Sequence, residues 1–215
     1  VEIVHGDIRD IRSAEAFVKG CDLIAHLAAL ISVPYSFRSP QSFIDTNVFG
    51  TLNLLQGAVR YGCQRFIQTS SSEVYGSPKS VPIIADHPLK AQSPYAASKI
   101  AADKLAESFF YSYELPAVIL RPFNTYGPRQ SNKAILPTIL AQILNNEKKI
   151  KLGSLWPRRD MTYVSDTVDG LVKSLNVKGI EGKTIQLGTG MDYSVEELVN
   201  ICLKSTDSDS IVQKD

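Results

Sequence analysis

Residues 65–73 read Arg-Phe-Ile-Gln-Thr-Ser-Ser-Ser-Glu, a short apolar run that ends in hydroxyl groups and a carboxylate. Its length and its Phe, Ile and Thr residues predict a β-strand over 65–69. A helical pattern over 94–113 and a second apolar run over 116–121 follow. A strand, a long helix and another strand are typical of a parallel βαβ unit. The stretch 65–121 therefore indicates the fold class.

The same alternation continues on both sides of this stretch. Further strands are expected at 1–5, 22–29, 149–152, 161–164 and 184–187, and further helices at 12–19, 40–61, 134–146, 166–175 and 194–204. Apolar strands that alternate with helices predict an α/β fold, in which a doubly wound parallel sheet is covered by helices on both faces. We expect a first domain over 1–128 and a smaller C-terminal α/β lobe over 129–215.

The composition excludes several classes of partner. The 215 residues include 23 Lys+Arg and 22 Asp+Glu without basic clusters, which argues against nucleic acid and against an anionic membrane surface. No apolar run approaches the roughly 18–20 residues of a membrane span. Cys21, Cys63 and Cys202 are far apart and show no CxxC spacing, so we expect buried, reduced thiols, no metal site and a cytoplasmic protein.

Ligands of open α/β sheets bind at the carboxyl ends of the strands. The residues expected there are Asp7, Ala28 and Ala29, the run Thr69 to Glu73, and the run Arg121 to Asn124. Small side chains let a flat ligand approach the backbone, and a carboxylate after a strand accepts hydrogen bonds from a ribose or an adenine amino group. These strand ends are the candidate binding positions.

Tyr95 and Lys99 are spaced so that both lie on one face of the predicted helix. A nearby ammonium favours the phenolate, so we expect Lys99 to lower the pKa of Tyr95 and make it a base. Tyr75 and Lys79 have the same spacing, but Gly76 and Pro78 exclude a helix there.

Two residues of the run after the strand at 65–69 complement this pair. The hydroxyl of Ser71 is suited to hydrogen-bond a substrate oxygen, and Glu73 offers a second, independent base. Taken alone, the run is more typical of a polar loop with a solvated Glu73 than of a catalytic site. The combination of Ser, Glu, Tyr and Lys at neighbouring strand ends favours a catalytic site.

In this combination the chain resembles the extended short-chain dehydrogenase/reductases that act on nucleotide-activated sugars. The matching motifs occur in family order: Gly6-Asp-Ile-Arg-Asp10, His26-Leu-Ala-Ala29, Thr46-Asn-Val-Phe-Gly-Thr51, Ser70 to Gly76, Ser93-Pro-Tyr-Ala-Ala-Ser-Lys99, Arg121 to Arg129, Arg159 to Asp166 and Gly188 to Ser194. The resemblance implies a Rossmann-like domain that binds NAD, followed by a lobe that binds a nucleotide-diphosphate sugar.

The resemblance also implies roles for individual residues. The implied cofactor-binding residues are Asp7, Ile8, Leu27, Ala28, Ala29, Thr46, Tyr95, Lys99 and Pro122. The implied catalytic residues are Ser71, Ser72, Glu73, Tyr95 and Lys99, with Tyr95 as the base that takes the sugar hydroxyl proton. The implied substrate-binding residues are Ser32, Ser71, Asn124 and Arg159, the last two on the diphosphate.

Glu73 favours one activity within this family, the 4,6-dehydratases. Oxidation at C4 acidifies the C5 proton, Glu73 would remove it, water would leave from C6, and the hydride would return to C6 to give a 4-keto-6-deoxy sugar. The deoxythymidine-diphosphate-glucose branch places an Asp before this Glu, whereas Ser72 resembles the GDP-mannose and legionaminic-acid-pathway branches. The alternatives are a 4-epimerase, a UDP-hexuronate decarboxylase and a non-catalytic NAD-binding scaffold.

Two further expectations concern the ends of the chain and its assembly. No G-x-G-x-x-G motif is present, and Val1 to His5 resembles a strand that follows a first βαβ unit. We therefore expect an N-terminal strand–helix unit to be missing, and NAD binding by these residues alone to be weak or absent. The resemblance implies a homodimer in which the helices at 40–61 and 94–113 form a four-helix bundle.

Overall fold

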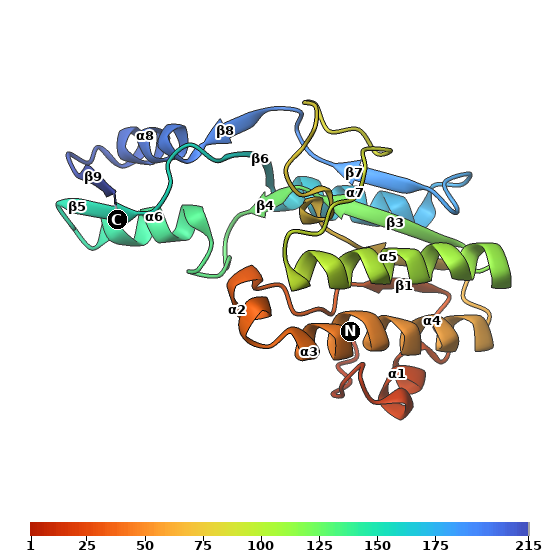
Figure 1. The fold of residues 1–215 in the computed structure, drawn as a ribbon. Helices are drawn as coiled ribbons and strands as arrows, with labels where there is room; N and C mark the ends of the chain where they lie inside the picture. The colour runs from red at the N-terminus through yellow and green to blue at the C-terminus, as the bar shows by residue number, and fades with distance from the viewer. Residues whose placement is uncertain (215) are drawn as a thin grey trace. The chain divides into compact units, whose positions relative to one another are not determined.

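The computed structural model describes residues 1–214, which form two compact units (Figure 1). The first unit contains Val1–Pro122 and Val168–Leu187, and the second contains Phe123–Thr167 and the residues from Gly188 onward. The predicted single division after residue 128 is therefore wrong. Residues 168–187 return to the first unit because they include a strand that pairs with its sheet.

The first unit is built on a four-stranded parallel sheet in the order β1-β2-β3-β7. The strands are β1 (Leu23–His26), β2 (Arg65–Thr69), β3 (Ala117–Pro122) and β7 (Thr184–Leu187). The helices associated with them are α1 (Ile11–Val18), α2 (Val33–Arg38), α3 (Pro40–Phe43), α4 (Gly50–Arg60), α5 (Pro94–Tyr113) and α7 (Val164–Asn176).

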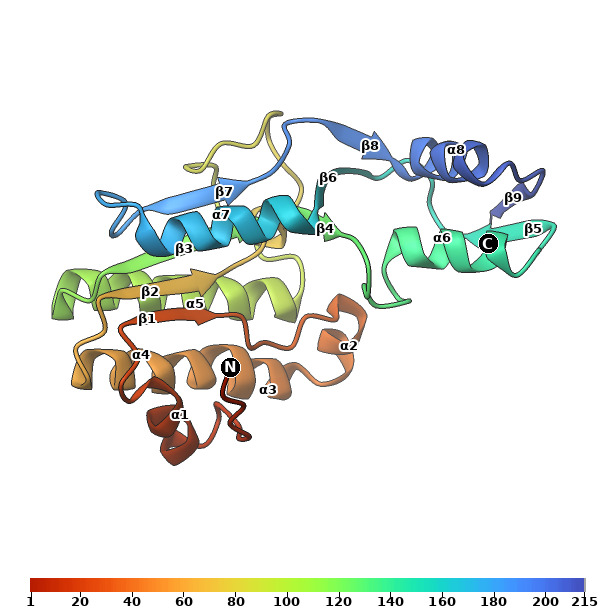
Figure 2. The same cartoon turned by 180° about the vertical axis from the view of Figure 1, so that it is seen from behind.

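Alternate residues of the central strands serve opposite faces of the sheet, because successive side chains of a strand point to opposite sides. Phe66, Ala117 and Ile119 pack in a core with residues of α1, α4 and α5. Ile67 and Val118 pack in a second core against leucines of α7. Figures 1 and 2 show α5 on one face of the sheet and α7 on the other. The predicted α/β fold, with helices on both faces of a parallel sheet, is confirmed.

The helix predicted over 40–61 is continuous but not regular. α3 passes into a π-helical turn over Ile44–Phe49, labelled η1, which passes into α4. A π turn inserts an extra residue into a helix and is frequent at functional sites. Here it contains Asn47, whose buried side chain is fully used in hydrogen bonds described below.

The strand predicted over residues 1–5 is not observed. Val1, Ile3 and Val4 are exposed, and no described strand pairs with this stretch. A strand is stable only when its backbone groups are paired with a neighbour, so the apolar pattern alone did not suffice. Three short strands were missed, β4 (Asn124–Tyr126), β8 (Asp192–Ser194) and β9 (Ile211–Lys214).

The second unit combines two small sheets with two helices. β4, β6 (Arg158–Tyr163) and β8 form one sheet, and β5 (Lys149–Leu152) pairs with β9. α6 (Ile135–Leu144) and α8 (Val195–Thr206) share a core with these strands, which includes Ile139, Ile150 and Leu198. α8 begins with a capping box, in which Ser194 and Glu197 exchange hydrogen bonds.

The three cysteines are unpaired, as predicted, but only two of them are buried. Cys63 and Cys202 are buried, whereas Cys21 is exposed at the end of α1. Within residues 1–214 no cluster of potential metal ligands is found. None of the helices described in this part of the chain has the length and apolar character needed to cross a membrane.

Candidate active site

The run of hydroxyl residues after β2 folds into a short 3-10 turn, η2 (Ser72–Tyr75). Ser71 caps this turn, because its hydroxyl accepts a hydrogen bond from the backbone N–H of Glu73 at 3.2 Å. The N–H of Ser70 donates to the carbonyl of Leu120 at 2.7 Å, which ties the turn to β3. Ser71, Ser72 and Glu73 therefore lie together at the carboxyl end of β2.

Tyr95 and Lys99 occupy the first two turns of α5. Ser93 caps the helix by accepting from the N–H of Ala96 at 3.0 Å, and Pro94 occupies its first position, where a missing N–H costs nothing. Both Tyr95 and Lys99 are buried. The ammonium of Lys99 donates to the carbonyl of Thr69, which joins α5 to the end of β2.

The second tyrosine–lysine pair, Tyr75 and Lys79, behaves as predicted. Residues 76–92 contain no helix; Tyr75 is fully buried and Lys79 is exposed. The phenol of Tyr75 is instead bound by Arg121 and Gln186, at 3.0 and 2.9 Å.

The pKa of Tyr95 is raised above its usual range, so the predicted lowering by Lys99 is not found. Burial is the main cause of the rise; a hydrogen-bonding interaction with Ser71 opposes it, and the charges of Glu73 and Asp103 add to it. The physical reason is that loss of solvent disfavours the phenolate, while the ammonium of Lys99 is bound to the backbone of Thr69.

Burial also controls the pKa of Lys99, which is lowered to about 8. Asp103 opposes this shift with its negative charge. Asp103 lies one helical turn beyond Lys99 on α5, and burial raises the pKa of its own carboxyl, against the effect of Arg121. A buried lysine and a buried carboxylate thus accompany Tyr95 along one face of the helix.

Sequence reasoning missed two polar residues that support this region, Asn47 and Asp103. Asn47 accepts from the N–H of Leu30 at 2.8 Å and donates to the Leu30 carbonyl and to the hydroxyl of Ser98, both at 2.9 Å. Asp103 follows Lys99 at the same four-residue spacing that relates Lys99 to Tyr95, and that spacing could have identified it. Asn47 lies in the motif Thr46 to Thr51, but its hydrogen-bond partners come from distant segments, so local spacing gave it no role.

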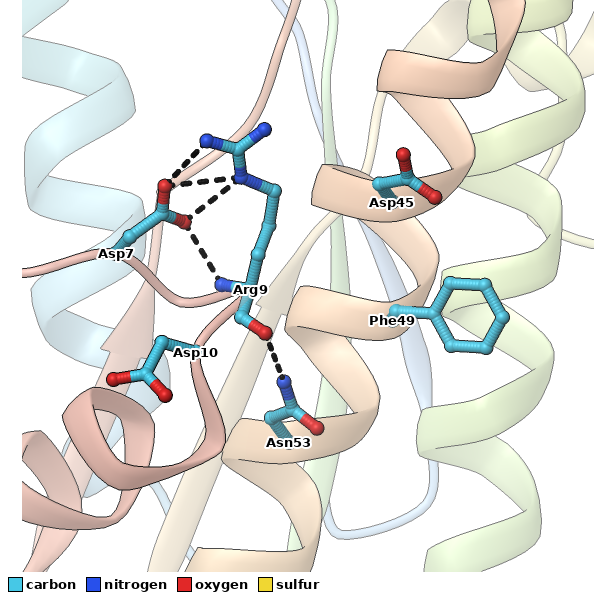
Figure 3. A pocket seen from close by; sticks show the side chains of 6 residues that line it. All are labelled: Asp7, Arg9, Asp10, Asp45, Phe49 and Asn53. Atoms are coloured by element: carbon cyan, nitrogen blue, oxygen red, sulfur yellow. Dashed lines mark hydrogen bonds and ion pairs between the residues drawn. The ribbon is translucent and has the colours of Figure 1, made fainter.

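A pocket of about 630 Å³ lies between the segment from Asp7 to Asp10 and the helical stretch of η1 and α4, and Asp7 lines it (Figure 3). The Asp7 carboxylate is bound by the guanidinium of Arg9 at 2.6 Å, and this contact lowers the pKa of Asp7. Asn53 of α4 donates to the carbonyl of Ile8 at 2.9 Å. The Ile8 side chain packs in the core against Gly50, where an added Cβ would lie 2.5 Å from it. Asp7 thus faces the pocket, and Ile8 anchors its wall.

The remaining predicted cofactor residues follow strand ends of the same unit. Leu27 and Ala28 are exposed and Ala29 is half-buried after β1; Thr46 is half-buried in η1, and Pro122 ends β3. Ser32 caps α2 by accepting from the N–H of Tyr35.

Two predicted substrate residues, Asn124 and Arg159, belong to the second unit. Asn124 begins β4 and is half-buried. Arg159 is exposed on β6, opposite Tyr193 of β8, and its guanidinium donates to the carbonyl of Arg158 at 2.8 Å. Their role in substrate binding stays a prediction.

The sequence model of the family described as GDP-mannose 4,6 dehydratase matches residues 1–215. The chain belongs to this family. Its resemblance to the sugar-nucleotide branch of the extended short-chain dehydrogenase/reductases is thereby confirmed.

Relatives and solved structures of this family are similar over nearly the whole chain. A dTDP-glucose 4,6-dehydratase of Streptomyces griseus is 34% identical over 205 residues, which is 95% of this chain and 62% of the relative. DesIV of Streptomyces venezuelae, a dTDP-glucose 4,6-dehydratase solved with NAD and TYD bound, is 36% identical with a TM-score of 0.92; the match covers 99% of this chain and 66% of DesIV.

An epimerase of known structure is also similar to this family member. The UDP-glucuronic acid 4-epimerase of Bacillus cereus, solved with UDP-glucuronic acid and NAD, is 28% identical with a TM-score of 0.89, over 95% of this chain and 66% of that one. The chain therefore spans a little under two thirds of the length of these relatives.

Proposed function

We propose that this chain contributes the catalytic centre of an NAD-dependent nucleotide-diphosphate-sugar 4,6-dehydratase. The observation that carries the proposal is the presence of Glu73 on the turn capped by Ser71, in the same unit as the buried pair Tyr95 and Lys99. This arrangement offers two separate bases, a phenol and a carboxylate, for the two proton removals that such a reaction needs. NAD, when bound, accepts a hydride from the sugar and later returns it.

The residues of the first unit fit a dinucleotide. The pocket beside Asp7 has a volume of about 630 Å³, within the range of about 300–1,000 Å³ typical of small-molecule sites, and offers a carboxylate for hydroxyl or amino donors. The exposed Ala28 leaves the backbone after β1 accessible. At the end of β2, Thr69 has a buried hydroxyl oxygen without a hydrogen-bond partner among the described residues. Its backbone carbonyl accepts the hydrogen bond from Lys99. We propose that Asp7 and Ile8 hold the adenosine half, that Leu27, Ala28, Ala29, Thr46 and Pro122 line the cofactor's course, and that Lys99 binds the nicotinamide ribose.

The chain's own groups would act in a fixed order. Tyr95 takes the proton of the C4 hydroxyl while Ser71 donates a hydrogen bond to the same oxygen. Glu73 then removes the C5 proton, which the C4 ketone has made acidic, and the C6 hydroxyl leaves as water with a proton from Glu73 or Ser72. Loss of water leaves a C5–C6 double bond; return of the hydride to C6 and of a proton to C5 would then give the 4-keto-6-deoxy sugar nucleotide. Ser32, Asn124 and Arg159 would hold the substrate.

Glu73→Gln tests the assignment in the full-length protein with NAD⁺ and a panel of UDP-, GDP-, CDP- and dTDP-sugars. We expect the parent to release one water per sugar, detected by mass spectrometry, and the variant to oxidise C4 without losing water. Glu107→Gln, which alters a carboxylate paired with Lys104 on the outside of α5, is the matched control and should be unaffected. Equal water loss by Glu73→Gln and parent would contradict the proposal.

The same panel separates the alternatives. Loss of CO₂ from a UDP-hexuronate would indicate a decarboxylase, and inversion at C4 without mass loss would indicate an epimerase, the activity named for the Bacillus cereus neighbour. NAD binding without turnover would indicate a non-catalytic scaffold. The Ser at position 72 supports the GDP-mannose or legionaminic-type branch, and turnover of a GDP-sugar in preference to dTDP-glucose would support it further.

We also propose that the protein is a cytoplasmic homodimer. Phe49 before α4 and Tyr111 on α5 are large exposed side chains, 53% and 72% accessible, on the two helices that would form a four-helix bundle. Sedimentation of the full-length protein checks the oligomeric state, and a monomer at micromolar concentration would contradict it. Reduced thiols in the protein isolated under non-reducing conditions would support a cytoplasmic location.

A further inference from the structure

The turn that carries Ser71 and Glu73 makes few hydrogen bonds of its own. η2 is a single 3-10 turn, a type with poor hydrogen-bond geometry. Its backbone is tied to the rest of the unit through the N–H of Ser70, which donates to Leu120, and through the carbonyl of Val74, which accepts from Lys90 at 2.9 Å. The placement of its two candidate catalytic side chains therefore depends on contacts made by other side chains of the turn.

Ser70, just before the turn, and Tyr75, its last residue, contact one buried ion pair, Asp103–Arg121. The pair has an N–O distance of 3.0 Å, and its side chains are 1% and 6% exposed. The hydroxyl of Ser70 donates to Oδ2 of Asp103 at 2.8 Å. At the other end of the turn, Nη1 of Arg121 donates to the hydroxyl of Tyr75 at 3.0 Å. The pair thus binds the residue before Ser71 and the second residue after Glu73.

The same ion pair is connected to Lys99 and to a third strand. Asp103 lies one turn beyond Lys99, and Lys99 donates to the carbonyl of Thr69, directly before Ser70. Gln186 of β7 donates to the Tyr75 hydroxyl at 2.9 Å, so that hydroxyl accepts from two fixed donors. The turn is consequently held from α5, β3 and β7 at once.

Stability alone is a poor explanation for this arrangement. The desolvation of two buried charges offsets much of their attraction, and apolar residues of similar volume often serve as well. Asp103 also leaves Oδ1 buried without a hydrogen-bond partner. What the ion pair provides, and apolar residues could not, is a set of directional contacts at fixed distances from the two ends of the turn.

We propose that Asp103 and Arg121 are positioning residues that hold Ser70 and Tyr75, and through them place Ser71 and Glu73 against the substrate sugar. This inference rests on the proposed dehydratase function. The two contacts act on different steps: the Ser70 contact governs Ser71 and therefore the oxidation at C4, whereas the Tyr75 contact governs Glu73 and therefore the removal of the C5 proton.

Two variants that each remove one hydroxyl test the inference in the full-length protein with NAD⁺ and the sugar nucleotide that the parent consumes. In single turnovers followed by NADH fluorescence and quenched-flow mass spectrometry, Ser70→Ala should slow oxidation by at least about 10-fold, since small misplacements of reacting groups cost up to about 100-fold. Tyr75→Phe should oxidise at the parental rate but lose water at least about 10-fold more slowly. The KM of the sugar nucleotide should stay unchanged in both.

Glu181→Gln is the matched control, because it breaks the partly buried ion pair of Arg65 at the opposite end of β2. It should lower the melting temperature without changing either step. Hydrogen exchange gives a readout that needs no turnover: amides of residues 71–76 should exchange about 10-fold faster in Tyr75→Phe than in the parent, and at the parental rate in Glu181→Gln.

The outcomes separate the two proposals. If the parent consumes no sugar nucleotide, the proposed function fails, and the exchange rates still decide whether the ion pair holds the turn. If Ser70→Ala and Tyr75→Phe slow both steps equally, in proportion to lost thermal stability, the positioning role is overturned. Unchanged exchange over residues 71–76 in Tyr75→Phe would overturn it as well.

Discussion

Replacing Asn47 by Ala removes a side chain that links three separate segments of the first unit. The amide is 1% exposed and makes three hydrogen bonds, two to the backbone of Leu30 in the loop after β1 and one to Ser98 on α5. Ser98 in turn donates to the carbonyl of Tyr95 at 2.7 Å. The substitution leaves the N–H and carbonyl of Leu30 without these partners and opens a small gap that no apolar group fills.

The expected destabilisation follows from these contacts. A buried polar group left without a partner costs about 1–3 kcal/mol; the buried hydroxyl of Ser98 loses one bond, and the part-buried backbone groups of Leu30 lose two. The better helix propensity of Ala returns about 0.5 kcal/mol. We therefore expect a net loss of about 2–4 kcal/mol, which lowers the melting temperature of a chain of this size by about 5–15 °C.

Far-UV circular dichroism is a suitable assay, because α4 and α5 provide about half of the helical residues of the first unit, whereas the single tryptophan, Trp156, lies in the second. Asn53→Ala is the matched control. Asn53 lies further along the same helical stretch and donates hydrogen bonds to the carbonyls of Ile8 and Arg9. Because Asn53 is only half-buried, water replaces these contacts, and the loss in free energy of unfolding should be about 1 kcal/mol or less. Equal shifts for the two variants would refute the reasoning.

Three further outcomes are expected. Lys99→Met removes a buried amine whose pKa is lowered to about 8. Below that pH the amine is charged in the folded protein and the full free-energy cost of burying it applies, so the parent should gain stability relative to the variant as the pH rises from about 8 towards 10.5. Melting temperatures at several pH values measure this gain. Tyr95→Phe should lower kcat by about 10²–10⁴ in the full-length protein while NAD affinity measured by calorimetry is retained. Gly57→Ala places a Cβ 2.5 Å from the stiff side chain of Val18, so it should destabilise by about 1–3 kcal/mol, and adding Val18→Ala should recover part of that loss, as measured by urea unfolding.

Local pattern predicted the elements of the first unit well because its strands and helices carry strong, single-period signals. The strand at 65–69 and the helix at 94–113 were predicted with the bounds that the structure has. Phe66 and Ile67 of the strand face opposite cores, and Ala106 and Phe109 of the helix pack with Phe66 in one of them, so few other arrangements bury them. In the second unit β5 was predicted with the bounds that the structure has, whereas β4 and β8 were missed because three residues are too few for a period to be recognised.

The residues of the candidate site also fall into two groups, those that local sequence spacing identifies and those that only the packed fold brings to their partners. Tyr95 and Lys99 were found from the sequence because one helix determines their relation, and four-residue spacing suffices to bring them together. Asn47, Asp103 and Arg121 acquire their partners only when η1, α5 and β3 are packed side by side. A hydrogen bond over 51 positions in sequence, such as that of Asn47 to Ser98, leaves no local signature.

The sequence by itself determined the chemical groups at the strand ends, the parallel α/β architecture and the membership of a sugar-nucleotide family. Only the tertiary structure decided how deeply those groups are buried, and with it their pKa values and contacts. The pKa of Tyr95 is raised rather than lowered, and the turn with Glu73 is held by a buried ion pair. Both result from exclusion of water, and the solvent exposure of a side chain depends on all the segments packed around it rather than on its neighbours in the sequence.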